Sequence, residues 1–373
     1  MIMTISQSSK PAKRNANIEL LRILSTLCII MSHITFQAGF NHYQRTVSSV
    51  LISLFSCAGN IAVNLFLMIG VFYMSDTAFS GKRILSIWSQ VFFYTSLITA
   101  LVTALGFPVP LKELLRGYFP FAGRALWFAS AYITLLLVTP FLNKVFLWDI
   151  KQQNLFLVIL FAAMCLVSSM PGEVRTYLSD SLWFWFVYLA MGCYKRHCLA
   201  SEGVLKNHRG LLLFLSFLLY LMLCLIFHFT AAYSPESCLA RAMNQISFQY
   251  ISDIKSLPSF LCAFLIFNYV IQCRERTSKV IQTLASSSFS VYIIHQVPAF
   301  IPVLWGRICR IQTLIDKPWS VRYLILIAVS VYAAVSLIDL PRRMLETRWQ
   351  KSSLFQRAAA AIERQYRNAK LLD

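Results

Sequence analysis

Long runs of apolar residues, separated by short polar segments, occupy most of this chain. Each run is close to the roughly 20 residues that a helix needs to cross the hydrocarbon core of a bilayer. We expect ten membrane spans, at 18–37, 49–74, 87–106, 125–143, 154–170, 181–194, 210–230, 256–273, 284–304 and 320–340. The sixth is the shortest, and Trp183, Trp185 and Tyr188 give its start an interfacial character. The pattern predicts an all-α protein, a polytopic transmembrane helix bundle.

The composition supports a membrane protein and argues against a nucleic-acid-binding one. Of the 373 residues, 58% are hydrophobic and only 13% charged, whereas a soluble domain carries about 25% charged residues. The formal net charge is +19. The basic residues fall between the apolar runs and near the C-terminus, not on one soluble face with interleaved aromatics. They are therefore expected to orient the helices and to contact the headgroups of membrane lipids.

The distribution of lysine and arginine predicts the topology. With the N-terminus in the cytoplasm, inner segments hold 22 of these residues and outer segments hold 11. This bias places both termini in the cytoplasm. We divide the chain into a cytoplasmic N-terminal tail (1–17), a transmembrane bundle (18–340) and a basic cytoplasmic C-terminal tail (341–373). The first span carries no small-residue cleavage pattern and is expected to be an uncleaved helix.

The sequence leaves two features undecided, the structure of the C-terminal tail and the state of the cysteines. The C-terminal tail contains the run Ala358–Ala361 and suits either a basic helix along the inner leaflet or a solvated, partly disordered end. The ten cysteines lie mostly within apolar runs, and no Cys-x-x-Cys spacing occurs, so neither a metal site nor a disulfide framework is indicated. Cys238 and Cys309 fall near the predicted outer face, where a bridge between them is compatible with the sequence.

Arg22 and His33 are the most informative pair in the chain. They lie eleven residues apart in the first apolar run. Eleven helical steps return to within about 20° of the start and advance roughly 16 Å, so both side chains share one face. Ionisable groups at membrane depth are costly and often functional. Imidazole suits proton transfer near neutral pH, although His33 would also serve as a structural hydrogen-bonding group.

Arg22 likewise has two interpretations. It is either a headgroup anchor paired with Glu19, three residues earlier, or a site for an anionic group that enters from the cytoplasm. Guanidinium suits phosphate well. The axial distance between Arg22 and His33 fits the pantetheine arm of coenzyme A.

Four further polar residues accompany this pair. Lys82 and Arg83 follow the second span, where positive-inside anchoring explains them when they are taken alone. His295 lies in the ninth span at a depth comparable with His33, so the two histidines would line a common cavity. Asn64 lies within the second span, and a hydrogen bond between helices is its simpler role.

Motifs of soluble enzymes are absent from the sequence. It contains no glycine-rich phosphate loop, no Gly-x-Ser-x-Gly elbow and no His-Glu-x-x-His motif. Acidic residues are also scarce in the spans, which disfavours ion-coupled transport.

Several motifs in register resemble the acyltransferase-3 family of bacterial integral-membrane O-acyltransferases. They are Arg22 through His33 (the Arg-x10-His element), Leu65 to Gly70 (Phe-Phe-x-x-Ser-Gly), Leu126-Trp127-Phe128 with Tyr132 and Pro140, and Ser290-Val-Tyr292-Ile-Ile-His295. Their order matches along nearly the whole chain. The chain departs from the family at Leu65, at Ile69 in place of the serine, and at Ser86, where an arginine is expected.

The resemblance implies an activity and its participants. The donor would be cytoplasmic acyl-coenzyme A, usually acetyl-CoA, used as a co-substrate with no cofactor bound permanently. The acceptor would be a hydroxyl of a cell-surface glycan or of its lipid-linked precursor, at the bacterial inner membrane. His33 is assigned as catalytic and Arg22 as donor-binding or positioning. Further candidates for substrate or donor binding are Lys82, Arg83, Trp127, Tyr292, His295, Asn64 and Glu19.

Two other functions remain alternatives to acyl transfer. Ten helices with a polar interior would suit a transporter or exporter of lipid-linked glycans, and turnover of acetyl-CoA would separate the two. A non-catalytic membrane scaffold is a third possibility, which the buried Arg22, His33 and His295 disfavour. The sequence does not indicate the oligomeric state.

Overall fold

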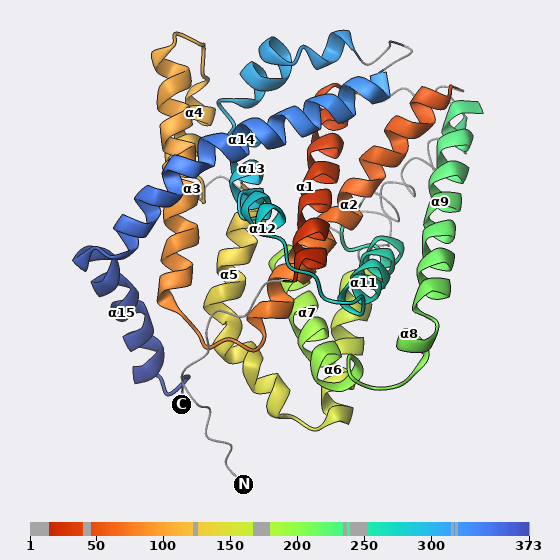
Figure 1. The fold of residues 1–373 in the computed structure, drawn as a ribbon, viewed down its shortest axis with the longest axis vertical. Coiled ribbons are helices and arrows are strands. Elements are labelled where there is room, and N and C mark those ends of the chain that lie inside the picture. Colours follow the sequence, from red (N-terminus) through yellow and green to blue (C-terminus); the bar gives the residue numbers. More distant parts are fainter. Residues whose placement is uncertain are drawn as a thin grey trace.

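The computed structural model shows a bundle of helices (Figure 1). It describes residues 15–39, 46–121, 126–166, 180–233, 237–238, 253–314, 317 and 320–372. Within these residues the regular elements are all helical, with no β-strand. The predicted all-α class is therefore confirmed.

The helices follow the apolar runs closely. The elements of the first half are α1 (Ala16–Gln37), α2 (Val47–Met74), α3 (Gly81–Ala104), α4 (Leu111–Tyr118), α5 (Trp127–Leu142), η1 (Asn143–Leu147), α6 (Ile150–Phe161) and η2 (Ala162–Leu166). Those of the second half are α7 (Asp180–Cys193), η4 (Tyr194–Cys198), α8 (Val204–Asn207), α9 (Arg209–Tyr233), α11 (Leu257–Ile271), α12 (Lys279–Ala285), α13 (Ser288–His295), η5 (Pro302–Ile308), η6 (Ile311–Thr313), α14 (Ser320–Gln350) and α15 (Ser353–Asn368).

Six helices of the described chain are long and apolar enough to cross a membrane. They are α1, α2, α3, α14, the segment Trp127–Leu147 and the segment Arg209–Thr230. Two shorter apolar helices, Ile150–Met164 and Leu257–Ile271, accompany them. The protein is thus a multi-pass membrane protein, while the count of ten spans and the cytoplasmic side of both termini stay predictions.

The expected ninth span is not one continuous helix. Residues 284–304 are divided among α12, α13 and η5, with turns between them. Helix α13 ends at His295, three residues before Pro298, because proline has no backbone N–H to donate to the carbonyl of Ile294 and also disfavours helical backbone at Val297, the residue before it. This break places His295 at the C-terminal end of the short helix α13.

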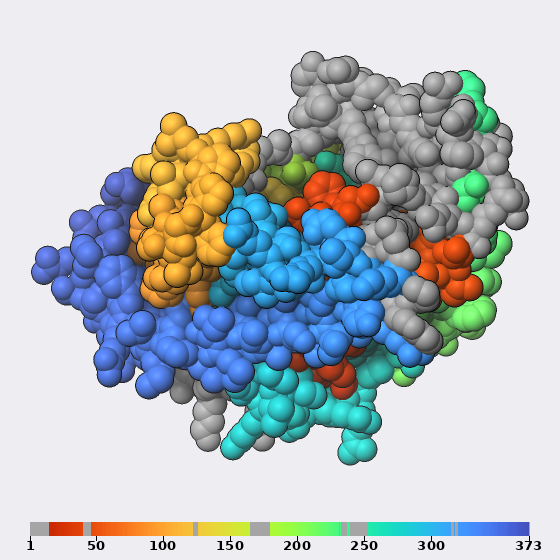
Figure 2. Space-filling view, turned by 90° about the horizontal axis from the view of Figure 1, so that it is seen from above, coloured from red at the N-terminus to blue at the C-terminus, as the bar shows by residue number. Residues whose placement is uncertain are grey.

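Helix α1 occupies the centre of the bundle. It contacts α2, α11, α12, α13 and α14, and Asn15 caps its start by accepting a hydrogen bond from the backbone N–H of Asn17. The close packing of α1 on α2 depends on Gly59, where an added Cβ would lie 2.3 Å from the side chain of Ser32. Seen from above (Figure 2), the end of α1 (red) reaches the surface beside the light-blue segment that precedes α14.

The C-terminal residues form regular structure. Helix α14 continues through Pro341 as far as Gln350, and α15 then packs on the beginning of α3. The backbone N–H of Gly81 donates to Glu363 at 3.0 Å, and Phe355 is buried. The tail is therefore helical, which decides between the two alternatives for its backbone. Cys238 and Cys309 are both free, so the structure contains no bridge between them.

Candidate functional site

Two histidines from distant parts of the chain meet inside the bundle. Nδ1 of His33, on α1, lies 2.8 Å from Nε2 of His295, on α13. His295 is fully buried. Its own Nδ1 lies 2.5 Å from the carbonyl oxygen of Val291, and the amide of Gln296 lies 3.0 Å from Nδ1 of His33. The structure therefore joins the two histidines that the sequence placed at a similar depth.

These contacts fix the direction of the hydrogen bonds when both rings are neutral. A carbonyl oxygen only accepts, so Nδ1 of His295 donates to Val291. Nε2 of His295 then carries a lone pair and accepts from Nδ1–H of His33. With its oxygen turned toward His33, the amide of Gln296 accepts from the same N–H. Nε2 of His33 is left as the proton acceptor of the pair.

His33 faces a narrow apolar cavity. Its free volume is about 20 Å³, room for about one water molecule. The lining residues are Thr26, Ile29, His33, Val63, Phe66, Trp127, Phe128 and Tyr292. Trp127 and Tyr292, both candidates from the sequence, thus lie beside His33. A larger ligand would enter only if some of these side chains moved.

One face of α5 connects this cavity to two arginines. Phe128, in the cavity wall, stacks on Tyr132 one turn further along, with ring centroids 6.2 Å apart. Tyr132 lies within reach of the charges of both Arg22 and Arg83. Gly70 makes room for it, because an added Cβ there would lie 3.2 Å from the Tyr132 hydroxyl. Tyr132 thus links the aromatic wall of the cavity beside His33 to the charges of Arg22 and Arg83.

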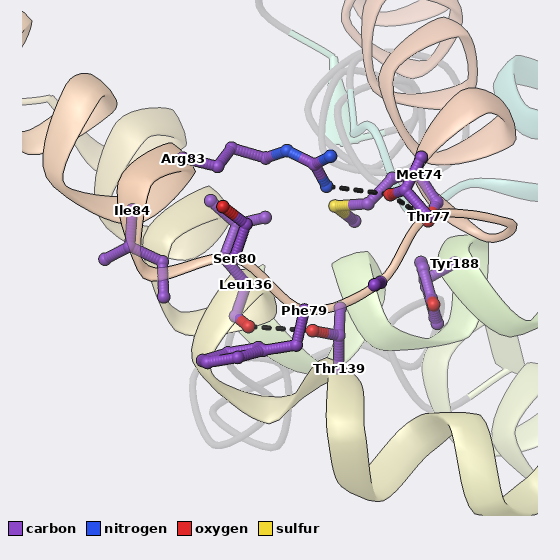
Figure 3. Close-up of a pocket in the computed structure, with 10 residues that line it drawn as sticks. Met74, Thr77, Phe79, Ser80, Arg83, Ile84, Leu136, Thr139 and Tyr188 are labelled. Carbon is purple, nitrogen blue, oxygen red and sulfur yellow. Dashed lines mark hydrogen bonds between the residues drawn. The ribbon is translucent and has the colours of Figure 1, made fainter. Parts of the chain in front are cut away.

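The two arginines differ in their partners. Arg22 donates to the buried carboxylate of Glu19 at 2.8 Å, the pairing considered from the sequence. Arg83 donates to the hydroxyl of Thr77 at 3.0 Å and forms no ion pair within the described residues. In Figure 3 its guanidinium reaches from the start of α3 across a small pocket toward Thr77 and Met74. Arg83 therefore keeps hydrogen-bonding capacity for an anion, and the neighbouring Lys82 is exposed.

Other candidates have structural contacts. The side-chain amide of Asn64 is fully buried; it donates to the carbonyl of Ile254 at 2.7 Å and accepts from the indole of Trp183 at 2.9 Å. These bonds join α2, α7 and the segment before α11. Asn64 does not line the cavity beside His33. Among the described residues, no group of three or more His, Cys, Asp or Glu side chains is placed to hold a metal ion.

A buried carboxylate that the sequence interpretation missed supports the helix of His295. Asp339 on α14 is fully buried. It accepts hydrogen bonds from Tyr94, Ser287, Ser290, Arg342 and Arg343 at 2.6–3.1 Å. Ser287 and Ser290 lie at the start of α13, so this carboxylate fixes α13 against α3 and α14. A lone acid inside an apolar run was the available signal.

Basic residues on the loops that the sequence places in the cytoplasm were also underestimated. Arg196 donates to the carbonyl oxygens of Gly192 and Ser75, both at 3.0 Å, and therefore stabilises the end of α2. A second set, Arg209, Arg274 and Arg276, lines an open groove of about 490 Å³ beside the start of α1. Positive charge at this end of the molecule is thus more extensive than Arg22, Lys82 and Arg83.

The comparison with known families gives the class of the protein. The acyltransferase-3 family model, described as an acyltransferase domain, matches residues 15–339. Neither the curated proteins nor the solved structures gave a significant match. The match covers most of the chain, including both histidines and the helices that hold them. The chain therefore belongs to the acyltransferase-3 family and is a multi-pass membrane acyltransferase.

Proposed function

We propose that the protein transfers an acyl group, in the first instance acetyl, from cytoplasmic acyl-coenzyme A to a hydroxyl of a cell-surface glycan or of its lipid-linked precursor, at the bacterial inner membrane. The observation that carries this proposal is the pair His33–His295. Its hydrogen bonds leave Nε2 of His33 as a proton acceptor beside a cavity within the bundle. In a family of acyltransferases, a base at this depth is suited to activate a hydroxyl.

In the proposed reaction His33 acts as general base. Nε2 takes the proton of the acceptor hydroxyl while its oxygen attacks the thioester carbon. The tetrahedral intermediate collapses as the C–S bond breaks, and the thiolate leaves with the proton from His33. His295 holds the ring and accepts from Nδ1–H throughout. An acyl-histidine formed on Nε2, then attacked by the hydroxyl, would use the same geometry.

The donor would approach from the side of the arginines. Arg83 and the exposed Lys82 suit the phosphates of coenzyme A because neither is paired with a carboxylate in the described chain. Arg22, compensated by Glu19, would position the arm that extends past Tyr132 toward His33. The apolar lining of the cavity would keep water away from the thioester.

The test is acetyl transfer by a His33→Ala variant. Membranes from a deletion strain that expresses each variant receive radiolabelled acetyl-CoA, and label in the carbohydrate fraction is measured. We expect transfer to fall by about 10²–10⁴-fold, the usual contribution of a general base. His208→Ala, at an exposed position, is the matched control and should retain wild-type transfer.

Two results would overturn the proposal. Wild-type transfer by His33→Ala, in protein present at normal levels in the membrane, would remove His33 from the chemistry. Export of a lipid-linked glycan by the wild-type protein without consumption of acetyl-CoA would instead favour a transporter.

A further inference from the structure

The hydroxyl of Tyr292 is buried in the bundle without a hydrogen-bond partner in the described part of the chain. The residue is 9% exposed, and its ring packs against Phe128 and Phe289. Leaving a buried hydroxyl unpaired costs about 1–3 kcal/mol. A ligand that accepts a hydrogen bond from this hydroxyl when it binds would explain why the group is buried without a partner.

The beginning of α5 faces the same hydroxyl. The first hydrogen bond of this helix runs from the backbone N–H of Ser130 to the carbonyl of Leu126 at 3.1 Å, and no side chain caps its start. The N–H groups of residues 127–129 therefore have no acceptor within the helix. Those of Phe128 and Ala129 lie close enough to interact as donors with the oxygen of Tyr292, although neither makes a hydrogen bond of normal geometry, and the O–H of Tyr292 keeps no acceptor in the described chain. Together these N–H groups form the positive end of the helix dipole.

Both features adjoin the cavity of His33. Tyr292, Trp127 and Phe128 form its wall opposite residues of α1 and α2. The remaining hydroxyl in the lining belongs to Thr26, and it already donates to the carbonyl of Arg22 at 2.9 Å. Apart from His33, the lining thus offers a ligand two side-chain donors, the hydroxyl of Tyr292 and the indole N–H of Trp127, and of these only the Tyr292 hydroxyl is a buried group without a partner in the described chain.

We propose that the Tyr292 hydroxyl, supported by the N-terminus of α5, is the oxyanion donor of the active site. This inference rests on the proposed function. The hydroxyl of Tyr292 would donate to the carbonyl oxygen of the thioester, while the N–H groups of Phe128 and Ala129 polarise the phenol from behind. Tyr292 is then a catalytic residue that touches the reacting carbonyl.

In the proposed reaction, negative charge develops on the carbonyl oxygen of the thioester, to which Tyr292 would donate. When the acceptor oxygen bonds to the thioester carbon, the π electrons of the carbonyl move to its oxygen, which becomes an oxyanion. The proton of the hydroxyl goes to His33. Breakage of the C–S bond restores the carbonyl and releases the thiolate, which is protonated by His33. A donor in an apolar cavity stabilises the intermediate more than the neutral thioester, and this difference lowers the barrier.

The variant Tyr292→Phe tests the assignment. It keeps the ring and its aromatic contacts and removes only the unpaired hydroxyl, so the fold should be unaffected. We expect the maximal rate of acetyl transfer to fall by about 10²–10³-fold, with little change in the apparent KM for acetyl-CoA. Tyr220→Phe is the matched control, because Tyr220 on α9 is also buried and donates to the carbonyl of Cys57 at 2.9 Å, away from the cavity. It should transfer at the wild-type rate.

A second measurement separates an oxyanion donor from a packing role. In a trifluoromethyl ketone analogue of acetyl-CoA, the acceptor hydroxyl adds to the carbonyl carbon and gives its proton to His33, which forms an oxyanion that has no thiolate to expel. Ethyl-CoA lacks the carbonyl. Tyr292→Phe should weaken inhibition by the ketone by at least tenfold and leave inhibition by ethyl-CoA unchanged. Equal weakening of both, or a transfer rate within threefold of wild type, would overturn the role of Tyr292. If the wild-type and Tyr220→Phe proteins transferred no acetyl group at all, the proposed function itself would fail.

Discussion

Replacing His295 with leucine would test whether the two histidines act as one unit. In the structure Nε2 of His295 accepts from Nδ1–H of His33 at 2.8 Å, and its own Nδ1 binds the carbonyl of Val291. Leucine fills a similar space but accepts no hydrogen bond. Nδ1–H of His33 would keep only the amide of Gln296 as a partner, at 3.0 Å. The ring would then be held less firmly in the tautomer and orientation that present Nε2 as the base.

The expected loss can be worked from the hydrogen bond that disappears. As His33 takes a proton, its ring becomes positively charged, so the bond to His295 strengthens in the transition state. A hydrogen bond to a charged group contributes about 1.5–3 kcal/mol. Each 1.36 kcal/mol corresponds to tenfold in rate, so His295→Leu should slow transfer by roughly 10–150-fold. His295→Gln, whose amide oxygen accepts a hydrogen bond, should lose less than about tenfold.

The assay is the incorporation of radiolabelled acetyl groups from acetyl-CoA into membrane carbohydrate, at saturating donor. Four proteins form a double-mutant cycle: wild type, His33→Ala, His295→Leu and the combination of both. If His295 acts only through His33, the double variant should be no slower than His33→Ala, because residues that act as a unit are not additive. The level of each variant in the membrane is measured by immunoblot.

Two outcomes would refute this reasoning. Transfer by His295→Leu within threefold of wild type would show that the contact between the rings does not matter for the reaction. A double variant slowed by the product of the two single effects would show that His295 acts independently of His33.

Two further predictions concern the donor path and the bundle. Arg83→Gln should raise the apparent KM for acetyl-CoA by about tenfold with little change in maximal rate, since it removes one charged contact of about 1.4 kcal/mol. Lys144→Gln, at an exposed basic position elsewhere, should leave the KM unchanged. Equal KM values for the two variants would contradict a role of Arg83 in donor binding. Asn64→Leu should lower the stability of the purified protein in detergent by about 2–4 kcal/mol, because it leaves the indole of Trp183 and the carbonyl of Ile254 buried and unpaired; an unchanged thermal midpoint would argue against this contribution.

Sequence reasoning succeeded where the signal was local and repetitive. Apolar runs of membrane length predicted helices, and α1, α2, α5, α9 and α11 match the expected limits to within three residues, whereas α3 begins six residues earlier than expected and α14 continues ten residues further. The prediction of a continuous ninth span was wrong because it followed the apolar residues alone and did not consider Pro298, which disfavours helix in the residues before it. The sequence interpretation considered the arginines and histidines of the spans and missed Asp339, the acid in the last apolar run.

By itself the sequence determined the helical class and the membrane setting and singled out Arg22 and His33 as candidates, because hydrophobic periodicity and the cost of buried charge are properties of short segments. Only the tertiary structure decided which groups meet. It brought His295 to His33 across 262 residues, placed the start of α5 against Tyr292, and used Asn64 and Asp339 to join helices. Hydrogen bonds of this kind form only when separate elements are positioned to within a few tenths of an ångström. That precision is set by the packing of the whole bundle.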